Sequence, residues 1–260
     1  MIKPADSRGS RGVYLIDDPS TFDLLFEKSK SYSVSGRVLV ERFLPGPQVS
    51  TESIVLDGVV YTPGFSDRNY EHLHKYAPSI IENGGQLPSS LPQAIQRKIE
   101  DVLAQAAKCV EIEHGVIKGD IVVSDGKVHI IEIAGRLSGG YFCTHEIPLN
   151  TGVDFVGAAI KQAVGWNVEP TSLVPKQQNF VAQRYFFPSP GVVSSIKNVE
   201  RFHSHPDVEL LEIRVDIGDE VSEIHNHPGR AGVVITKGKD AKAAVDLAEA
   251  VVAGIEIRTE

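Results

Sequence analysis

Two short Asp-Gly turns constrain the fold of this chain more than any other feature of its sequence. Each turn joins two apolar or alternating runs, 49–56 with 59–63 through Asp57-Gly58 and 118–123 with 128–133 through Asp125-Gly126. Asp-Gly between such runs is typical of a β-hairpin, because the tight turn needs residues that accept positive φ. The sequence therefore predicts two antiparallel hairpins.

Helical periodicity adds several helices to these hairpins. The predicted helices are 92–112, 153–164, a helix capped by Asp240 that runs to about 252, and a shorter one that begins at Pro19. Further strands are predicted at 13–16, 37–41, 180–187, 192–196, 208–215, 232–236 and 254–258. Helices and strands mix without regular βαβ alternation, which indicates an α+β fold with largely antiparallel sheets.

Composition excludes some classes of function. The formal net charge is −8 and the pI about 5.6, which opposes nucleic-acid binding, because phosphate backbones are held by an excess of Lys and Arg. The sequence has neither a long apolar run nor a signal-like segment at its start, so no membrane contact is expected. Cys109 and Cys143 form no Cys-x-x-Cys motif, which favours reduced thiols and a cytoplasmic location.

The first residues contain a candidate phosphate-binding loop. Lys3 precedes the polar run Gly9-Ser10-Arg11-Gly12, where glycines let backbone N–H groups converge on an anion and the lysine supplies charge. The loop is not a Walker motif, because GxxxxGK[ST] is absent. A solvated polar turn is the alternative interpretation.

Two carboxylates on neighbouring predicted strands form a second candidate site. Asp120 lies in one strand of the second hairpin and Glu132 in the other, with Arg136 shortly after. Paired carboxylates are hard oxygen ligands of the kind that hold Mg²⁺ against phosphates. The sequence therefore predicts a magnesium and phosphate site at this hairpin.

Four segments in this order resemble the ATP-grasp superfamily, close to the branch of carboxylate–amine ligases that includes L-amino acid ligases and carbamoyl-phosphate-synthase-like proteins. The segments are KPADSRGSRGV, VLVERFLPGPQVSTES, GDIVV with HIIEIAGRLSGG, and the predicted helix from TGVDF. Together they cover roughly residues 1–165. The resemblance implies an ATP-grasp fold of two α+β subdomains, followed by a small C-terminal α+β subdomain.

The resemblance also implies roles for individual residues. Lys3 and Arg136 are expected to act at the reacting phosphates as catalytic residues, Asp120 and Glu132 as metal ligands, and Lys118 as an added charge beside the substrate. The expected ATP-binding residues are Lys3, Ser7, Gly9, Ser10, Gly12, Glu41, Arg42, Phe43, Leu44 and Gln48. The expected cofactors are ATP and Mg²⁺, with Mn²⁺ as an alternative metal.

Two positions depart from the pattern of the family. Gln48 stands where many relatives have a ribose-binding glutamate, and Ala134 stands where relatives often carry asparagine two residues after the second acid. Alanine leaves fewer protein ligands for a second metal ion. An alanine at this place is also a trait of the amino-acid-ligase branch, so the site is interpreted as intact.

The implied reaction is phosphoryl transfer from ATP to a carboxylate, followed by attack of an amine on the acylphosphate. The expected partners are therefore small-molecule carboxylates and amines, with no protein nucleophile required. Because the family normally has an N-terminal α/β domain before the lysine segment, we expect a fragment that lacks it and a small subdomain truncated at its N-terminus. The alternative is a nucleotide-binding subunit that needs a separate N-terminal chain or a homo-oligomer.

The expected domains are 1–44, the remainder of the small lid with its phosphate loop; 45–168, the large subdomain with the metal site; and 169–260, the C-terminal subdomain. Segment 64–91 has weak periodicity and is interpreted as a long, partly ordered loop. Within it, Arg68 is a candidate clamp for a substrate carboxylate, with a solvated surface position as the alternative. His145 and Glu146 are further candidates for the substrate pocket.

A function of another class is suggested near the C-terminus. His225 and His227 form a His-x-His pair of the kind that binds a transition metal in a cupin. No acid follows within the next few residues, and the strand–helix–strand pattern after 232 does not suit a cupin barrel. An exposed loop is the other interpretation of this pair.

Overall fold

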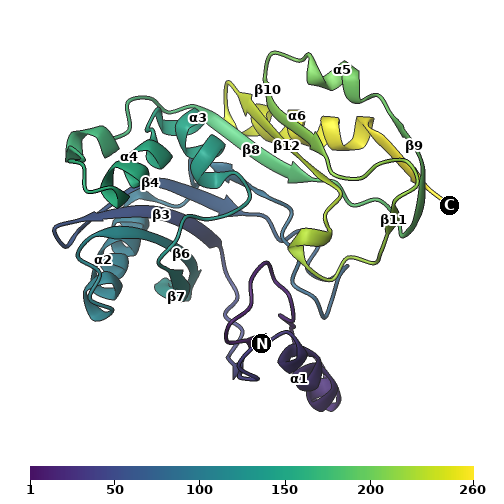
Figure 1. The fold of residues 1–260 in the computed structure, drawn as a ribbon, viewed down its shortest axis with the longest axis horizontal. Coiled ribbons are helices and arrows are strands. Elements are labelled where there is room, and N and C mark those ends of the chain that lie inside the picture. The colour runs from purple at the N-terminus through teal and green to yellow at the C-terminus, as the bar shows by residue number, and fades with distance from the viewer.

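In the computed structural model, which describes residues 1–260, an eight-stranded sheet forms the centre of the molecule (Figure 1). Its strands in chain order are β3 (Gln48–Leu56), β4 (Val59–Arg68), β5 (Gly85–Leu87), β6 (Gly115–Ser124), β7 (Lys127–Ala134), β8 (Phe180–Tyr185), β10 (Val208–Ile213) and β12 (Gly232–Gly238). They lie in the order β10-β12-β8-β5-β4-β3-β6-β7, and each neighbouring pair is antiparallel. The α+β fold class predicted from the sequence is confirmed.

The two Asp-Gly turns form the predicted hairpins. Asp57 has φ of 49° and Gly58 of 78°, and Asp125 and Gly126 have 49° and 72°. The first turn joins β3 to β4 and the second joins β6 to β7. The second hairpin brings Asp120 directly opposite Glu132.

Helices cover both faces of the sheet. On one face α2 (Gln93–Cys109) packs over β6 and β7, and α6 (Ala241–Gly254) packs over β8 and β12. On the other face, a π-helical turn η2 (Phe142–Glu146), α3 (Ile147–Thr151) and α4 (Phe155–Ala163) bury the largest apolar cluster. Asp240 caps α6, because its side chain accepts from Ala243 N.

The N-terminal residues form a small unit below the sheet, coloured purple in Figure 1. It contains β1 (Ile2–Pro4), a 3₁₀ turn η1 (Pro19–Thr21), α1 (Phe22–Ser31) and β2 (Val38–Val40), and β1 pairs with β2. Ile2, Tyr14 and Leu25 form its own small core. We call this unit, residues 1–40, the lid.

The remaining elements are short. They are η3 (Pro170–Leu173), β9 (Gly191–Lys197), α5 (Val199–His203), β11 (Glu220–Val221), η4 (His227–Gly229) and β13 (Glu256–Thr259). β11, β9 and β13 form a separate three-stranded sheet. The turn at η4 reaches back to the lid, where His227 N donates to Gly9 O at 3.0 Å.

Some local predictions were wrong. Segment 64–91 is not one loop, because β4 continues to Arg68 and β5 occupies Gly85–Leu87. Residues 13–16 are not a strand, since only Tyr14 makes isolated bridges, to Ile2 and to Ser79. The short helix at Pro19 extends to Ser31, and the helix predicted for 92–112 ends at Cys109.

The expected domain boundary at 168/169 lies just before η3, but the central sheet continues across it through β5 and β8. Edge-to-edge pairing of these strands lets the C-terminal residues extend the same sheet. None of the helices combines the length and the apolar composition that a membrane span requires.

Candidate functional site

A cavity of about 790 Å³ lies between the lid, the segment 41–48 and the β6–β7 hairpin. It brings together nearly all residues that the sequence singled out. The predicted residues that line it are Lys3, Ser7, Gly9, Ser10, Glu41, Arg42, Phe43, Leu44, Gln48, Arg68, Lys118, Asp120, Glu132 and Arg136. Gly12 does not line it: this glycine is buried with φ of 71°, and a Cβ there would press on Pro4 and Tyr32.

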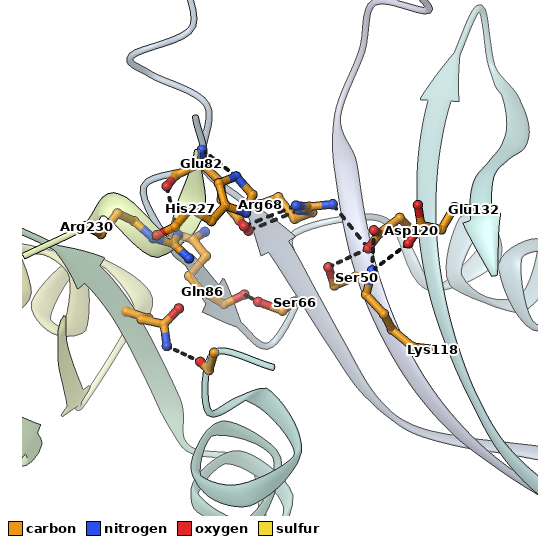
Figure 2. Close-up of polar contacts among 12 residues, drawn as sticks. Ser50, Ser66, Arg68, Glu82, Gln86, Lys118, Asp120, Glu132, His227 and Arg230 are labelled. Carbon is orange, nitrogen blue, oxygen red and sulfur yellow. Dashed lines mark hydrogen bonds and ion pairs between the residues drawn. The ribbon is translucent and has the colours of Figure 1, made fainter. Parts of the chain in front are cut away.

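Asp120 is the buried acid of the site. Its carboxylate accepts from Ser50 Oγ at 3.1 Å, lies 3.1 Å from Arg68 Nη1, and is bonded to Lys118 Nζ (Figure 2). Burial acts to raise the pKa of Asp120, but the charges of Arg68 and Lys118 outweigh it and bring the pKa to about 2. Asp120 is therefore ionised at any physiological pH.

Glu132 is the exposed acid of the pair. It stands opposite Asp120 in the β6–β7 register, and Lys118 Nζ lies 3.7 Å from its Oε1. Figure 2 shows both carboxylates and the lysine converging on the same side of the hairpin. Two hard oxygen donors thus lie next to the ammonium group of Lys118, which pairs with both of them.

Arg68 lies between two carboxylates of the protein itself. Its Nε and Nη2 bond to Glu82 at 3.0 and 3.1 Å, while Nη1 faces Asp120. Burial opposes the charged form of Glu82, but the charge and hydrogen bonds of Arg68, together with His227 and Arg230, lower the pKa of that carboxyl. The guanidinium expected to clamp a substrate thus already holds Glu82 and Asp120 in place.

The lid contributes a lysine to the lining of the cavity. Lys3 Nζ lies 2.7 Å from Glu41 Oε2 and donates to Ile131 O at 3.3 Å, so this lysine joins the lid to β7. The exposed Arg136 follows β7, and its Nη1 donates to the backbone O of Leu137. Lys3 precedes the two carboxylates in the sequence and Arg136 follows them. In the folded protein both cations line the same cavity.

The segment 41–48 forms the apolar end of the cavity. Phe43 and Leu44 line it together with Val122 and Ile130 of the hairpin. Gly46 has φ of 139°, and a Cβ at this position would collide with the backbone oxygen of Val123. The segment therefore lies directly against the β6–β7 hairpin, where a flat heterocycle can enter between apolar walls.

A second, more polar cavity of about 610 Å³ adjoins the first and shares Arg68, Lys118 and Arg136 with it. Its cationic lining comes from several elements. The residues are Arg8, Arg11, Arg68, Lys118, Arg136, Arg214 and Arg230. Glu82 and Glu146 also line it, whereas His145 does not.

Sequence reasoning missed Arg214, Arg230 and Tyr185. Tyr185 ends β8, Arg214 directly follows β10, and Arg230 lies between η4 and β12, so only the folded chain brings them to one cavity. Arg230 lies 3.5 Å above the ring of Tyr185 and donates to Glu82 O and His227 O. The arginine is buried, and its contacts with Tyr185 and Glu82 are distant in sequence. No local spacing signals such a position.

Glu52 was also missed. This fully buried residue of β3 accepts from Ser138 N at 2.6 Å, and its Oε2 has no hydrogen-bond partner. Burial raises the pKa of Glu52 to about 7, although the hydrogen bond from Ser138 and the charges of Lys118 and Arg136 act in the opposite direction. Glu52 thus anchors the loop that carries Arg136.

The raised pKa of Glu52 predicts that the free energy of unfolding falls as the pH rises. The folded-state pKa lies above the unfolded value of 4.5, so the folded protein binds the extra proton, and this stabilisation is lost as pH rises through about 7. The loss is about 3 kcal/mol for a shift of this size. Urea unfolding between pH 5 and 9 should show a flatter profile for Glu52→Gln than for the wild type. Equal slopes in the two proteins would contradict this assignment.

The cupin alternative is wrong. His225 is exposed and pairs with Glu223, whereas His227 is the first residue of η4 and its Nε2 accepts from Glu82 N at 3.3 Å. Burial lowers the pKa of His227 to about 3, with Arg230 acting in the same direction, so the imidazole is neutral. The strands form an open sheet rather than a cupin barrel, and no group of three or more His, Cys, Asp or Glu side chains could hold a metal ion.

Comparison of the sequence with known families agrees with this geometry. The sequence pattern of the ATP-grasp domain matches residues 1–140, and that of the L-amino acid ligase C-terminal domain 2 matches residues 184–260. The first match covers more than half of the chain. The chain therefore belongs to the ATP-grasp family, and its residues 184–260 are related to the L-amino acid ligase branch.

Two curated relatives are named as a synthase and a ligase. Carnosine synthase 1 of Gallus gallus is 24% identical over 142 residues, which are 54% of this chain and 15% of the relative. D-alanine–D-alanine ligase of Shouchella clausii (strain KSM-K16) is 28% identical over 144 residues, 51% of this chain and 36% of the relative. The matched region is thus a small part of each relative.

Solved structures show the same fold. L-amino acid ligase from Bacillus licheniformis superposes with a TM-score of 0.84 at 16% identity, covering 100% of this chain and 63% of that one. The biotin carboxylase domain dimer of Hydrogenobacter thermophilus 2-oxoglutarate carboxylase, in complex with MgADP, ADP and bicarbonate, has a TM-score of 0.69 at 17% identity and covers 99% and 57%. The chain spans less than two thirds of these proteins, and the ATP-grasp fold predicted from the sequence is confirmed.

Proposed function

We propose that this chain binds ATP with Mg²⁺ and serves a ligase that activates a carboxylate as an acylphosphate for attack by an amine. The observation that carries the proposal is the pair of adjoining cavities. The first has an apolar end at Phe43 and Leu44 and a charged end at Asp120 and Glu132. The second is lined by cations and shares Lys118 and Arg136 with the first.

The carboxylates fit a divalent metal bound together with a nucleotide. Asp120 and Glu132 lie opposite each other and supply hard oxygen ligands, and nucleotide phosphates with water complete such a site. A metal ion that is also bound by phosphates needs only one or two protein carboxylates. The side chain of Ala134 offers no third ligand. Mn²⁺ accepts the same ligand types. Bound Mg²⁺ supplies neutralisation of phosphate charge.

The nucleotide is assigned along the first cavity. The base would lie between Phe43 and Leu44 on one side and Val122 and Ile130 on the other, with the backbone of 41–44 at its polar edge. We assign Gln48 to the ribose, Glu41 to the base, and Ser7, Gly9 and Ser10 of the lid loop to the phosphates, since all five line this cavity. Arg42 lines the same end of the cavity.

The reacting end is assigned to Lys3, Lys118 and Arg136. Phosphoryl transfer needs charge stabilisation and positioning more than covalent chemistry. Lys118 and Arg136 line both cavities, and Lys3 lines the first. Arg136 makes only one hydrogen bond, to a backbone oxygen, so its remaining donors are available to a phosphoryl or carboxylate oxygen. Arg68 has its donors engaged and is assigned a positioning role instead.

Hydroxylamine trapping tests the proposed reaction. The chain is incubated with ATP, Mg²⁺, hydroxylamine and a set of carboxylic acids that includes the common amino acids, and hydroxamate is measured. We expect hydroxamate with at least one acid, and about 100-fold less with Arg136→Met, because a cation that stabilises transition-state charge is removed. Arg97→Met, on the exposed face of α2, is the matched control.

ATP binding without hydroxamate from any acid would contradict the ligase reaction for this chain. It would support the alternative function, in which the chain is the nucleotide-binding unit of a larger enzyme. Absence of both ATP binding and hydroxamate would contradict the proposed function in either form.

A further inference from the structure

Glu146 is a buried acid without a partner in the second cavity. It ends the π-helical turn η2, is 3% exposed and lines the cavity. Its carboxyl group makes no hydrogen bond and no ion pair with any residue of the chain. A polar group buried in this way is costly unless something else satisfies it.

Three of the arginines that line the second cavity with Glu146 are committed to other groups. Arg68 holds Glu82 and Asp120, Arg230 donates to the backbone oxygens of Glu82 and His227, and Arg214 bonds to Glu212 and Tyr141. The second cavity thus contains several arginines whose charge is partly compensated and one carboxyl group that has no positive partner.

The titratable groups that face Glu146 do not supply a positive charge. They are Glu82 from the segment before β5, Cys143 from η2 and Tyr185 from β8. Burial raises the pKa of Glu146 to about 8, and the charge of Glu82 adds to the shift. The carboxyl group is therefore mostly protonated at neutral pH in the free protein, and a cation placed next to it would favour its ionised form.

We propose that Glu146 binds the ammonium group of the amine substrate and takes up its proton before the amine attacks. This inference rests on the proposed ligase function and assigns the residue that recognises the amine substrate. The surrounding arginines favour the anionic part of the same ligand. The site accordingly suits a molecule with both an ammonium and an anionic group.

The proton and electron movements balance. The ammonium transfers one proton to the Glu146 carboxylate, which leaves a neutral amine with a free electron pair. That pair forms the N–C bond to the acyl carbon, the C–O bond to the phosphate breaks, and phosphate leaves with the second proton of the nitrogen. A proton acceptor with a pKa near that of the working pH serves such a transfer well.

Calorimetry in two buffers of different ionisation enthalpy tests the inference. The probes are the common L-amino acids at pH 7, with the deaminated acid of the tightest binder as a control ligand. In the wild type, binding of the amino acid should release close to one proton, because the pKa of Glu146 falls from about 8 to below the pH of the experiment. The deaminated acid should release none.

Glu146→Gln keeps the size of the side chain and removes its ability to ionise. We expect it to bind the amino acid about 10- to 100-fold more weakly, without proton release, as for the loss of a charged hydrogen bond. Binding of the deaminated acid should not change. Glu113→Gln, an exposed glutamate outside both cavities, should behave like the wild type.

Glu146→Asp guards against a variant that fails to fold, because it keeps the charge and should retain proton release with weaker binding. MgATP binding is measured on the same samples. A wild type that binds MgATP but no amino acid, or a Glu146→Gln protein that binds the amino acid as tightly as the wild type, overturns this inference and leaves the proposed function intact. A wild type that binds no MgATP removes the proposed function and this inference with it.

Discussion

Asp120→Asn is expected to abolish the effect of Mg²⁺ on ATP binding. Asparagine keeps the size of the side chain and an oxygen that accepts from Ser50, but it removes the buried negative charge that is assigned to the metal. The affinity for ATP measured with Mg²⁺ should fall to the affinity measured without it. Calorimetric titration with ATP, in the presence and absence of Mg²⁺, measures this difference.

The same substitution should also lower stability. Asp120 compensates Arg68 and Lys118, and removing one partner of a buried ion pair costs about 3 kcal/mol or more, because the remaining charges lose their partner. Asp125→Asn is the matched control. It lies in the exposed turn of the same hairpin, at φ of 49°, a conformation that asparagine also accepts, and should change neither property. A Mg²⁺ effect that survives in Asp120→Asn would rule out the assigned metal site.

Arg68→Leu is expected to destabilise the protein by about 3–5 kcal/mol. Leucine removes the cation between Glu82 and Asp120, and both carboxylates then stand close together in a buried place without it. Lys118 still compensates Asp120, so the larger part of the loss should come from Glu82. Urea unfolding at pH 7 measures the effect, with Arg97→Leu on the exposed face of α2 as control.

This prediction separates a positioning role from a substrate clamp. If Arg68 held a substrate carboxylate and little else, its replacement would weaken substrate binding and leave the free energy of unfolding nearly unchanged. Arg68→Lys should recover part of the stability, because it restores the charge without the two-pronged contact to Glu82. Wild-type stability in Arg68→Leu would contradict the role assigned here.

The hairpins and the carboxylate pair could be predicted because the determining signals are local. An Asp-Gly turn sets the register of its two strands, and the register of β6 and β7 places Asp120 opposite Glu132. The cap of α6 by Asp240 is of the same kind. The grouping of Lys3 with Glu41 across almost forty residues was accessible only through the resemblance to a family, since neither residue is close to the other in sequence.

Segment 64–91 was misjudged because its structure comes from pairing rather than periodicity. β5 is three residues long and is held between β4 and β8, so its own sequence carries almost no strand signal. Gly84 and Gly85 resembled loop residues. In the fold they are places where a side chain would strike the backbone of Gln183 or Asp67.

The buried acids show what sequence patterns leave out. In the sequence, Glu52 and Glu146 look like ordinary acidic residues. Their raised pKa values arise from burial by elements that lie far away along the chain. Glu52 could have been suspected only from its place within an apolar strand. For Arg68 the sequence suggested a contact with a ligand. In the folded chain its guanidinium contacts two carboxylates of the protein itself.

Calorimetric titration of the wild-type chain with ATP, with and without Mg²⁺, tests the central claim most directly. The claim is that the cavity between the lid, segment 41–48 and the β6–β7 hairpin is a nucleotide site completed by Mg²⁺ at Asp120 and Glu132. We predict one ATP bound per chain, with higher affinity when Mg²⁺ is present. No detectable binding under either condition would contradict it.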